Sequence, residues 1–99
     1  MLAVALTACG TGGIAKGSAD VENGKKLFLG KGQCAGCHTL AAAGSTGTLG
    51  PNLDQLKPPF AVVQRQVTNG GVKMPAFKGV LTDAQIKAVA KYVSSHAGK

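Results

Sequence analysis

The sequence predicts an all-α domain, and three features indicate this class. Apolar residues recur at helical spacing in three separate stretches, the last stretch carries a helix-capping sequence, and no stretch alternates apolar and polar residues as a half-buried strand does. A chain of 99 residues holds one domain at most. We expect residues 19–99 to form it, residues 9–18 to be a flexible tether and residues 1–8 to be the end of an export signal.

The first two helical stretches lie at the start and in the middle of the domain. The first is expected to begin at Ala19 or Asp20 and to end near Gly30; the second begins at Pro58-Pro59 and ends at Asn69-Gly70-Gly71. Their apolar faces are Val21, Gly24, Leu27 and Phe28 in the first helix and Phe60, Val63 and Val67 in the second. Between them, the small residues of 40–50 predict a loop.

The third stretch is the clearest helix. Thr82 and Gln85 have the spacing of a capping box, and Leu81 and Ile86 have that of a hydrophobic staple. The apolar stripe that follows is Ile86, Val89, Ala90 and Val93. This stretch therefore predicts a helix from about residue 82.

The composition predicts a core that needs help from a cofactor. The chain has no Trp, one Tyr, three Phe and fifteen Gly. A domain of this length buries only about 60–65% of its unfolded surface, and ordering many glycines has a high entropic cost. A large apolar cofactor at the centre would complete such a core.

The charge favours an acidic partner over nucleic acid. The net charge is +7, but it comes from ten lysines and a single arginine, with Lys25-Lys26 the only adjacent basic pair. A nucleic-acid surface would interleave basic clusters with aromatic residues for stacking, and no such cluster occurs. We therefore expect no nucleic-acid partner.

Cys9 stands apart from the other two cysteines. It ends the stretch Leu6-Thr7-Ala8-Cys9, which is similar to the cleavage box of bacterial lipoproteins, in which the cysteine becomes the lipid-modified first residue. The apolar start is too short to span a bilayer. We expect lipidation at Cys9; the alternative is an ordinary export signal that happens to contain a cysteine.

Cys34-Ala35-Gly36-Cys37-His38 is the central motif. The C-x-x-C-H spacing places two thiols where each can add to a vinyl group of haem, and it holds His38 beneath the iron. A thiol-redox motif would expect a βαβ context, and a zinc site would need a second ligand pair, for which only Cys9 and His96 remain. Chance occurrence is the third alternative.

Met74 is the candidate for the second iron ligand. It is the only methionine besides Met1, lies 36 positions after His38 and precedes Pro75, which stiffens the backbone. A thioether is a soft neutral donor that raises the reduction potential relative to a second imidazole. His96 is the rival, but it lies near the end of the last helix, where we expect it to be solvated.

Together these motifs resemble the class I (mitochondrial-type) cytochromes c, in particular their short bacterial and photosynthetic monohaem members. The matching pieces are CAGCH at 34–38, GPNL at 50–53, QVTNGG at 66–71, MPAF at 74–77 and LTDAQIKAVAKYV at 81–93. The resemblance implies a cytochrome c fold, with three to five short helices wrapped round one covalently bound haem c whose edge is exposed. It also implies that Gly24 and Phe28 cross Val89 and Tyr92.

The resemblance extends to residues around the haem. It implies that the backbone carbonyl of Pro51 accepts a hydrogen bond from the ring nitrogen of His38 that does not bind iron. It also places Gln66 and Asn69 near the haem, with solvent-facing amides as the alternative. The chain departs from the mitochondrial proteins because it has no Trp, and its generic loop at 42–47 does not show what covers the propionates.

With His38 and Met74 as ligands, the iron has no open position, so we expect a one-electron carrier between membrane redox complexes and not an enzyme. Expected partners are the acidic docking faces of cytochrome oxidase, a quinol-oxidising complex or a photosynthetic reaction centre, which Lys31, Lys73 and Lys78 would meet. We expect a monomer in the periplasm or at the outer face of the cytoplasmic membrane. The alternatives are an enzyme or gas sensor with labile Met74, and a fixed subunit of a respiratory complex.

Overall fold

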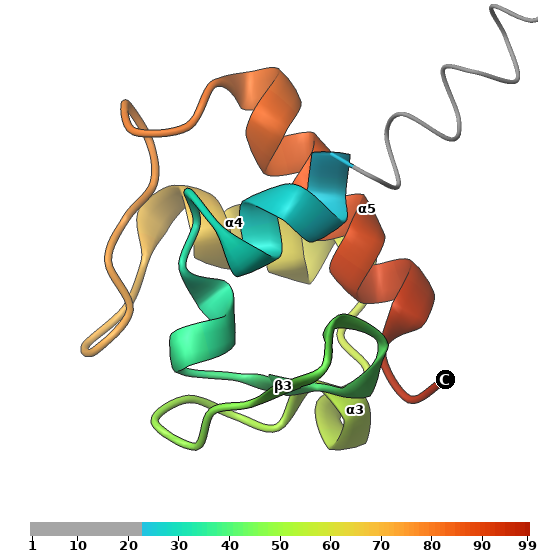
Figure 1. Cartoon of the computed structure of the whole chain (residues 1–99). Helices are drawn as coiled ribbons and strands as arrows, with labels where there is room; N and C mark the ends of the chain where they lie inside the picture. Colours follow the sequence, from blue (N-terminus) through green and yellow to red (C-terminus); the bar gives the residue numbers. More distant parts are fainter. Residues whose placement is uncertain (1–22) are drawn as a thin grey trace, which may run out of the picture.

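The structure, a computed structural model, describes residues 23–99 (Figure 1). The predicted export signal, Cys9, the predicted tether and the positions where the first helix was expected to begin lie outside these residues. The elements are a helix over 23–29, η1 (Cys34–Gly36), β2 (Thr39–Leu40), η2 (Ala41–Ala43), β3 (Ser45–Thr46), α3 (Leu53–Leu56), α4 (Phe60–Asn69) and α5 (Asp83–His96). The fold is therefore mostly helical, as predicted.

The helix at 23–29 packs against α5 through a glycine. A Cβ atom added at Gly24 would lie 2.5 Å from the carbonyl oxygen of Ala88, so no other residue fits there without displacing α5. The rings of Phe28 and Tyr92 lie beside this contact, 6.2 Å apart and inclined by 58°. The expected crossing of the first and last helices is confirmed, because the missing side chain lets the two backbones approach.

The start of α5 has the predicted cap. The hydroxyl of Thr82 accepts the backbone N–H of Gln85 at 3.1 Å, and the side-chain oxygen of Gln85 accepts the backbone N–H of Thr82 at 2.9 Å. Leu81 and Ile86 are both buried, as a hydrophobic staple requires. This fixes the first turn of α5 and the direction in which the chain enters it.

α4 also begins and ends where the sequence predicts. Pro59 precedes its first residue, and Gly70 follows its last with a φ of 69°, a value that favours glycine. Val63 and Val67 are buried. Phe60, which was expected on the same buried face, is 37% exposed, because it lies at a surface hollow that it lines together with residues of α5.

The stretch expected to be a structureless loop contains a small hairpin. β2 and β3 pair antiparallel, with Thr39 opposite Thr46 and Leu40 opposite Ser45. The prediction of no strands was therefore wrong here. Leu40 is completely buried and anchors the hairpin in the core, while α3, also not predicted, follows with Asn52 capping its first turn.

A single carboxylate ties three separate parts of the chain together below the hairpin. Asp54 in α3 accepts the backbone N–H of Gly98 and that of Ala41, each at 2.8 Å. These hydrogen bonds, first that from Gly98 and then that from Ala41, hold the pKa of Asp54 below its usual value. The C-terminus thus returns beside α3 in the lower half of Figure 1.

The buried side chains form one core between the helices. Its members are Leu27, Phe28, Leu40, Leu53, Val63, Val67, Phe77, Leu81, Ile86, Val89, Ala90, Tyr92, Val93 and Ala97. No helix in the described part of the chain is both long and apolar enough to cross a membrane.

Candidate cofactor site

The C-x-x-C-H motif lies on a single tight turn. Gln33 takes a left-handed conformation with a φ of 54° and starts η1, after which the N–H groups of Cys37 and His38 both bond to the carbonyl oxygen of Cys34, at 3.1 and 3.0 Å. Both cysteines are free thiols and half-buried, and Cys34 packs against the apolar core. The turn therefore presents two thiols and an imidazole from five consecutive residues.

The environment of these thiols does not suit the alternative chemistries. Burial raises the pKa of the Cys34 thiol to about 11, whereas the attacking cysteine of a redox motif has a lowered pKa. Among residues 23–99, no three His, Cys, Asp or Glu side chains lie close enough together to hold a metal ion. The raised pKa disfavours a redox dithiol, and residues 23–99 offer no second pair of ligands for zinc beside these thiols.

The ring of His38 is held in one orientation. Its Nδ1 donates to the carbonyl oxygen of Pro51 at 2.8 Å, because a carbonyl oxygen can only accept. The neutral ring then has its free electron pair on Nε2, the tautomer that a metal ligand needs. The hydrogen bond that the resemblance implied is present in the structure.

A glycine next to Pro51 allows this orientation. A Cβ atom added at Gly50 would lie 2.5 Å from Cε1 of the His38 ring. The N–H of Gly50 also donates to the carbonyl oxygen of Cys37 at 2.7 Å. The backbone at 50–51 therefore fastens to the C-x-x-C-H turn and contacts the imidazole at the same time.

Met74 lies in a loop that is fastened to α4. Its carbonyl oxygen accepts the N–H of Gly71 at 2.9 Å, which closes a tight turn, and the N–H of Phe77 donates to the carbonyl oxygen of Val67 at 2.9 Å. The Met74 side chain is half-buried and packs against the same core as Cys34. The loop thus holds a thioether at the core, as an iron ligand would have to be held.

Three other residues were considered for the site, and the structure places two of them on the surface and one against a neighbouring ring. Gln66 and Asn69 are exposed at the end of α4, and the side-chain nitrogen of Gln66 lies close to Gly71. His96 is not solvated as expected: it is half-buried, its Nδ1 donates to the carbonyl oxygen of Tyr92 at 2.9 Å, and the two rings stack with centroids 4.5 Å apart. The two residues are four positions apart on α5 and therefore lie on the same face of the helix, which accounts for this difference.

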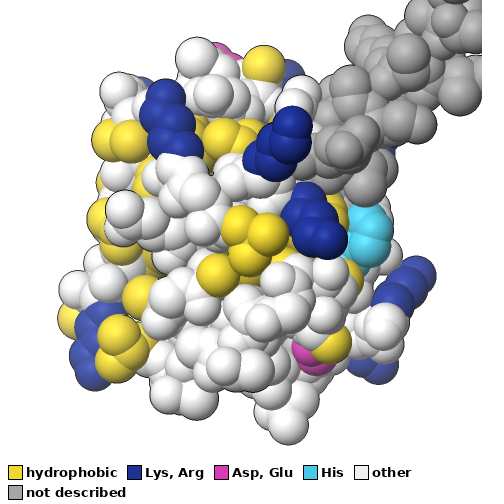
Figure 2. Space-filling model, viewed as in Figure 1, with side chains coloured by type: hydrophobic (Ala, Val, Ile, Leu, Met, Phe, Trp, Pro, Cys, Tyr) yellow, Lys and Arg dark blue, Asp and Glu magenta, His cyan; other side chains and the backbone are white. Residues whose placement is uncertain are grey.

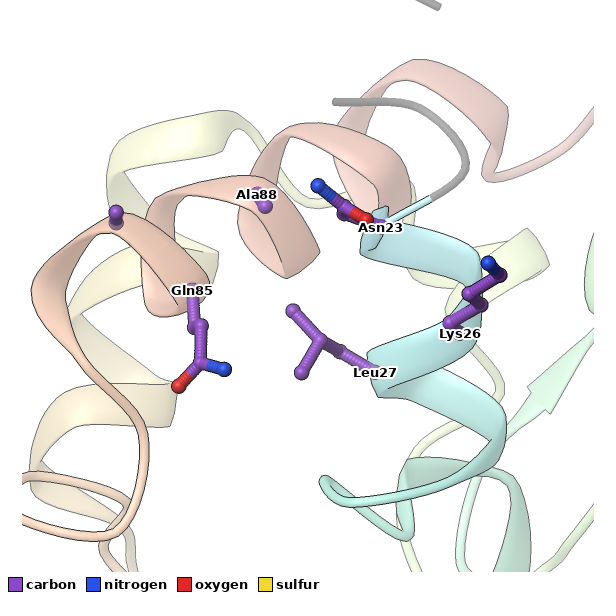
Figure 3. A pocket seen from close by; sticks show the side chains of 6 residues that line it. Asn23, Lys26, Leu27, Gln85 and Ala88 are labelled. Atoms are coloured by element: carbon purple, nitrogen blue, oxygen red, sulfur yellow. The ribbon is translucent and has the colours of Figure 1, made fainter. Parts of the chain in front are cut away.

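A surface hollow is lined by none of the residues predicted for the site. It has a volume of about 310 Å³ and lies between the helix at 23–29 and α5 (Figure 3). Its lining is Asn23, Lys26, Leu27, Ala84, Gln85 and Ala88. None of these is a candidate haem-attachment or iron-ligand residue.

Comparison with known proteins decides the family. The family described as cytochrome c oxidase, cbb3-type, subunit III matches residues 19–93. Cytochrome c6 of Bumilleriopsis filiformis is 37% identical over 80% of this chain and 94% of its own, and cytochrome c6 of Leptolyngbya boryana is 39% identical over 82% and 98%. The chain belongs to the class I c-type cytochromes. As such, this cytochrome carries covalently attached haem c and transfers electrons.

A solved structure supports the same conclusion for the fold of this cytochrome. The crystal structure of the c-type cytochrome SorU from Sinorhizobium meliloti superposes with a TM-score of 0.78, at 49% sequence identity. The alignment covers 83% of this chain and 95% of that one. The helical architecture described above is therefore the cytochrome c fold.

The residues present suit a covalently bound haem. The thiols of Cys34 and Cys37 lie on one turn, Nε2 of His38 is free to bind a metal, and the Met74 thioether lies against an apolar core. Sequence reasoning missed two neighbours of this site, Ser45 and Asp54. Both bond the hairpin that follows His38, and neither belongs to a recognisable motif.

Proposed function

We propose that Cys34 and Cys37 would hold the haem through thioether bonds and that His38 and Met74 would be the two protein ligands of its iron. The hydrogen bond from Nδ1 of His38 to Pro51 is the observation that carries this proposal. It fixes the tautomer that binds iron through Nε2 and increases the electron donation of the ring. Haem c, when bound, supplies the one-electron chemistry of its iron.

Two protein ligands make the protein a carrier and not a catalyst. With the imidazole of His38 and the thioether of Met74 both bound to the iron, substrate, oxygen or peroxide would find no open coordination site. The loop of Met74 supports this, since its turn and its bonds to α4 restrain the thioether. Gln66, in the last turn of α4 before this loop, is proposed to lie near the haem and to contribute a polar group there.

The family match favours a second candidate, a fixed subunit of a respiratory complex. The matching family is described by a subunit of a cbb3-type oxidase. The similarity to cytochromes c6 extends over nearly the whole length of those chains and supports the carrier instead. Purification in mild detergent separates the two, because a fixed subunit stays with an oxidase and a carrier does not.

Lysines on the exposed face are proposed to guide acidic partners to the haem edge. Lys31, Lys73 and Lys78 are exposed, and Val72 beside Lys73 is completely exposed. Figure 2 shows lysine and arginine side chains spread around hydrophobic ones on one face of the protein. Cytochrome oxidase, a quinol-oxidising complex and a photosynthetic reaction centre are the partner classes that would present such acidic faces.

Reversing two of these charges tests the docking face. In a Lys73→Glu and Lys78→Glu double variant, we expect the rate of electron transfer to hexacyanoferrate(III), an anion, to fall about tenfold at low ionic strength. The difference should shrink as salt is added, because the Debye length is about 8 Å at 0.15 M. Rates are measured by stopped flow with the reduced protein.

A second double variant, Lys87→Glu with Lys91→Glu in α5, is the matched control for the docking face. Both lysines are exposed and lie outside the Met74 loop, and their reversal changes the net charge by the same amount. A loss of rate as large in this control as in the Lys73→Glu and Lys78→Glu variant would show that only net charge matters and would contradict a docking face at the Met74 loop.

We also propose that the protein is exported and attached to a membrane through lipidated Cys9. The support is the sequence at residues 6–9 alone. Each buried methylene contributes about 0.8 kcal/mol, so two acyl chains give stable attachment. We expect wild-type protein to leave membranes with detergent but not with salt, and Cys9→Ser to leave the membrane with its haem spectrum unchanged. A wild-type protein released by salt would contradict the anchor.

A further inference from the structure

Ser45 is the buried polar residue of the described core. Only 7% of its surface is exposed, and it is the single polar or charged residue in residues 23–99 that is buried. It pairs with Leu40 across the hairpin between β2 and β3. A buried hydroxyl is costly unless it is hydrogen-bonded, so its partners indicate why it is there.

The hydroxyl of Ser45 forms hydrogen bonds with the backbone of the proposed iron ligand, His38, and of the residue two positions later. It donates to the carbonyl oxygen of His38 at 2.9 Å and accepts the backbone N–H of Leu40 at 3.1 Å. The carbonyl oxygen of Leu40 is more distant, at 3.4 Å, and the single hydroxyl proton favours His38. Ser45 thereby closes the chain around residues 38–40.

His38 is consequently held at two points. Its ring is fixed by the carbonyl oxygen of Pro51, and its own carbonyl is fixed by Ser45. A further bond, from the hydroxyl of Thr39 in β2 to the carbonyl oxygen of Gly47 at 2.9 Å, ties β2 to the residue that follows β3. The direction of the Cα–Cβ bond of His38 follows from the position of this backbone, and the plane of the imidazole follows from that direction. The hydrogen bonds of Ser45 help to hold this backbone in place.

We propose that Ser45 is a positioning residue for His38, which sets the orientation of the imidazole plane at the haem iron by fixing the backbone of its ligand. The proposal rests on the proposed iron ligation by His38. Ser45 would not contact the iron itself; it acts through the peptide groups of His38 and Leu40. Removal of the hydroxyl leaves two backbone groups without their partner and frees the hairpin to shift.

The test compares Ser45→Ala with Ser45→Thr in the haem-loaded protein. Ser45→Thr keeps the hydroxyl and suits a strand position. The control is Ser94→Ala in α5, which removes the same kind of bond, from a serine hydroxyl to a backbone carbonyl (Lys91, 3.2 Å), far along the sequence from His38. If Ser45→Ala gives no holoprotein, Ser45→Cys replaces it, since a thiol has nearly the same shape and is a weaker donor.

Two measurements report the position of the ligand directly. In the oxidised protein, the paramagnetic shifts of the haem methyl protons depend on the orientation of the axial ligands, and the reduction potential depends on how strongly the imidazole donates. We expect Ser45→Ala to change the order or spread of the methyl shifts and to shift the potential. Ser45→Thr and Ser94→Ala should leave both close to wild type.

Amide exchange gives a local measure of the same bond. We expect the exchange rate of the Leu40 N–H to rise about three- to tenfold in Ser45→Ala, because a net hydrogen bond contributes roughly 0.5–1.5 kcal/mol. Faster exchange with unchanged methyl shifts and potential would show a purely structural serine and would overturn the proposal. A failure of iron ligation by His38 is distinguishable, because the wild-type spectrum itself would then lack a His/Met-ligated haem.

Discussion

Replacing Cys34 and Cys37 together by alanine is expected to abolish the coloured holoprotein, even with the haem maturation machinery present. Both thiols lie on one turn that also positions His38, and loss of both removes every covalent attachment. In the wild type, the haem should survive acid and organic extraction. A normal yield of holoprotein from the double variant would show that the haem is held by something else.

The same variant is expected to be largely unfolded. Among residues 23–99, the core contains only three large aromatic rings, those of Phe28, Phe77 and Tyr92. A domain this small buries too little apolar surface to compensate for chain entropy. Circular dichroism should therefore show little helix and no cooperative melting. Cys9→Ser is the control, since it removes a thiol outside the motif and should fold and take up haem normally.

Replacing Met74 by alanine is expected to open the second axial position. Water would take the place of the thioether, the reduction potential would fall, and the reduced protein would bind carbon monoxide. The fold should persist, because the Met74 carbonyl, and not its side chain, closes the turn with Gly71. Optical titration with carbon monoxide and a redox titration measure these changes.

Val72→Ala is the matched control for the Met74 variant. Val72 lies in the same turn but is completely exposed, so its loss should leave the potential and the lack of carbon monoxide binding unchanged. Ready binding of carbon monoxide by the wild type would show that Met74 is not a firm ligand. The enzyme or sensor alternative would then be favoured.

Much of the helical framework could be predicted because its causes are local. Thr82 and Gln85 cap α5 from within one turn, and proline and glycine mark the ends of α4. The contact at Gly24 was expected from the resemblance and from the absence of a side chain there, and Tyr92 lies against it in the structure. The motif at 34–38 was predicted for the same reason, since its function depends on spacing within one turn.

The features that were missed depend on contacts between distant or very short segments. Strands of two residues, such as β2 and β3, are too short to show any alternation of apolar and polar residues. The carboxylate of Asp54 accepts a hydrogen bond from Gly98, 44 positions away, and no local sequence pattern predicts such a contact. The packing of His96 against Tyr92 is the exception, because the two residues are four positions apart on α5 and this local contact was within reach of the sequence.

The near-infrared absorption of the oxidised wild-type protein tests the central claim most directly. A ferric haem with a methionine ligand has a weak charge-transfer band in this region, and a five-coordinate or bis-imidazole haem lacks it. We expect the band in the wild type, because His38 and Met74 fill both axial positions, and we expect Met74→Ala to lose it. A wild-type protein with full haem occupancy and no such band would contradict ligation by Met74 and the closed carrier site built on it.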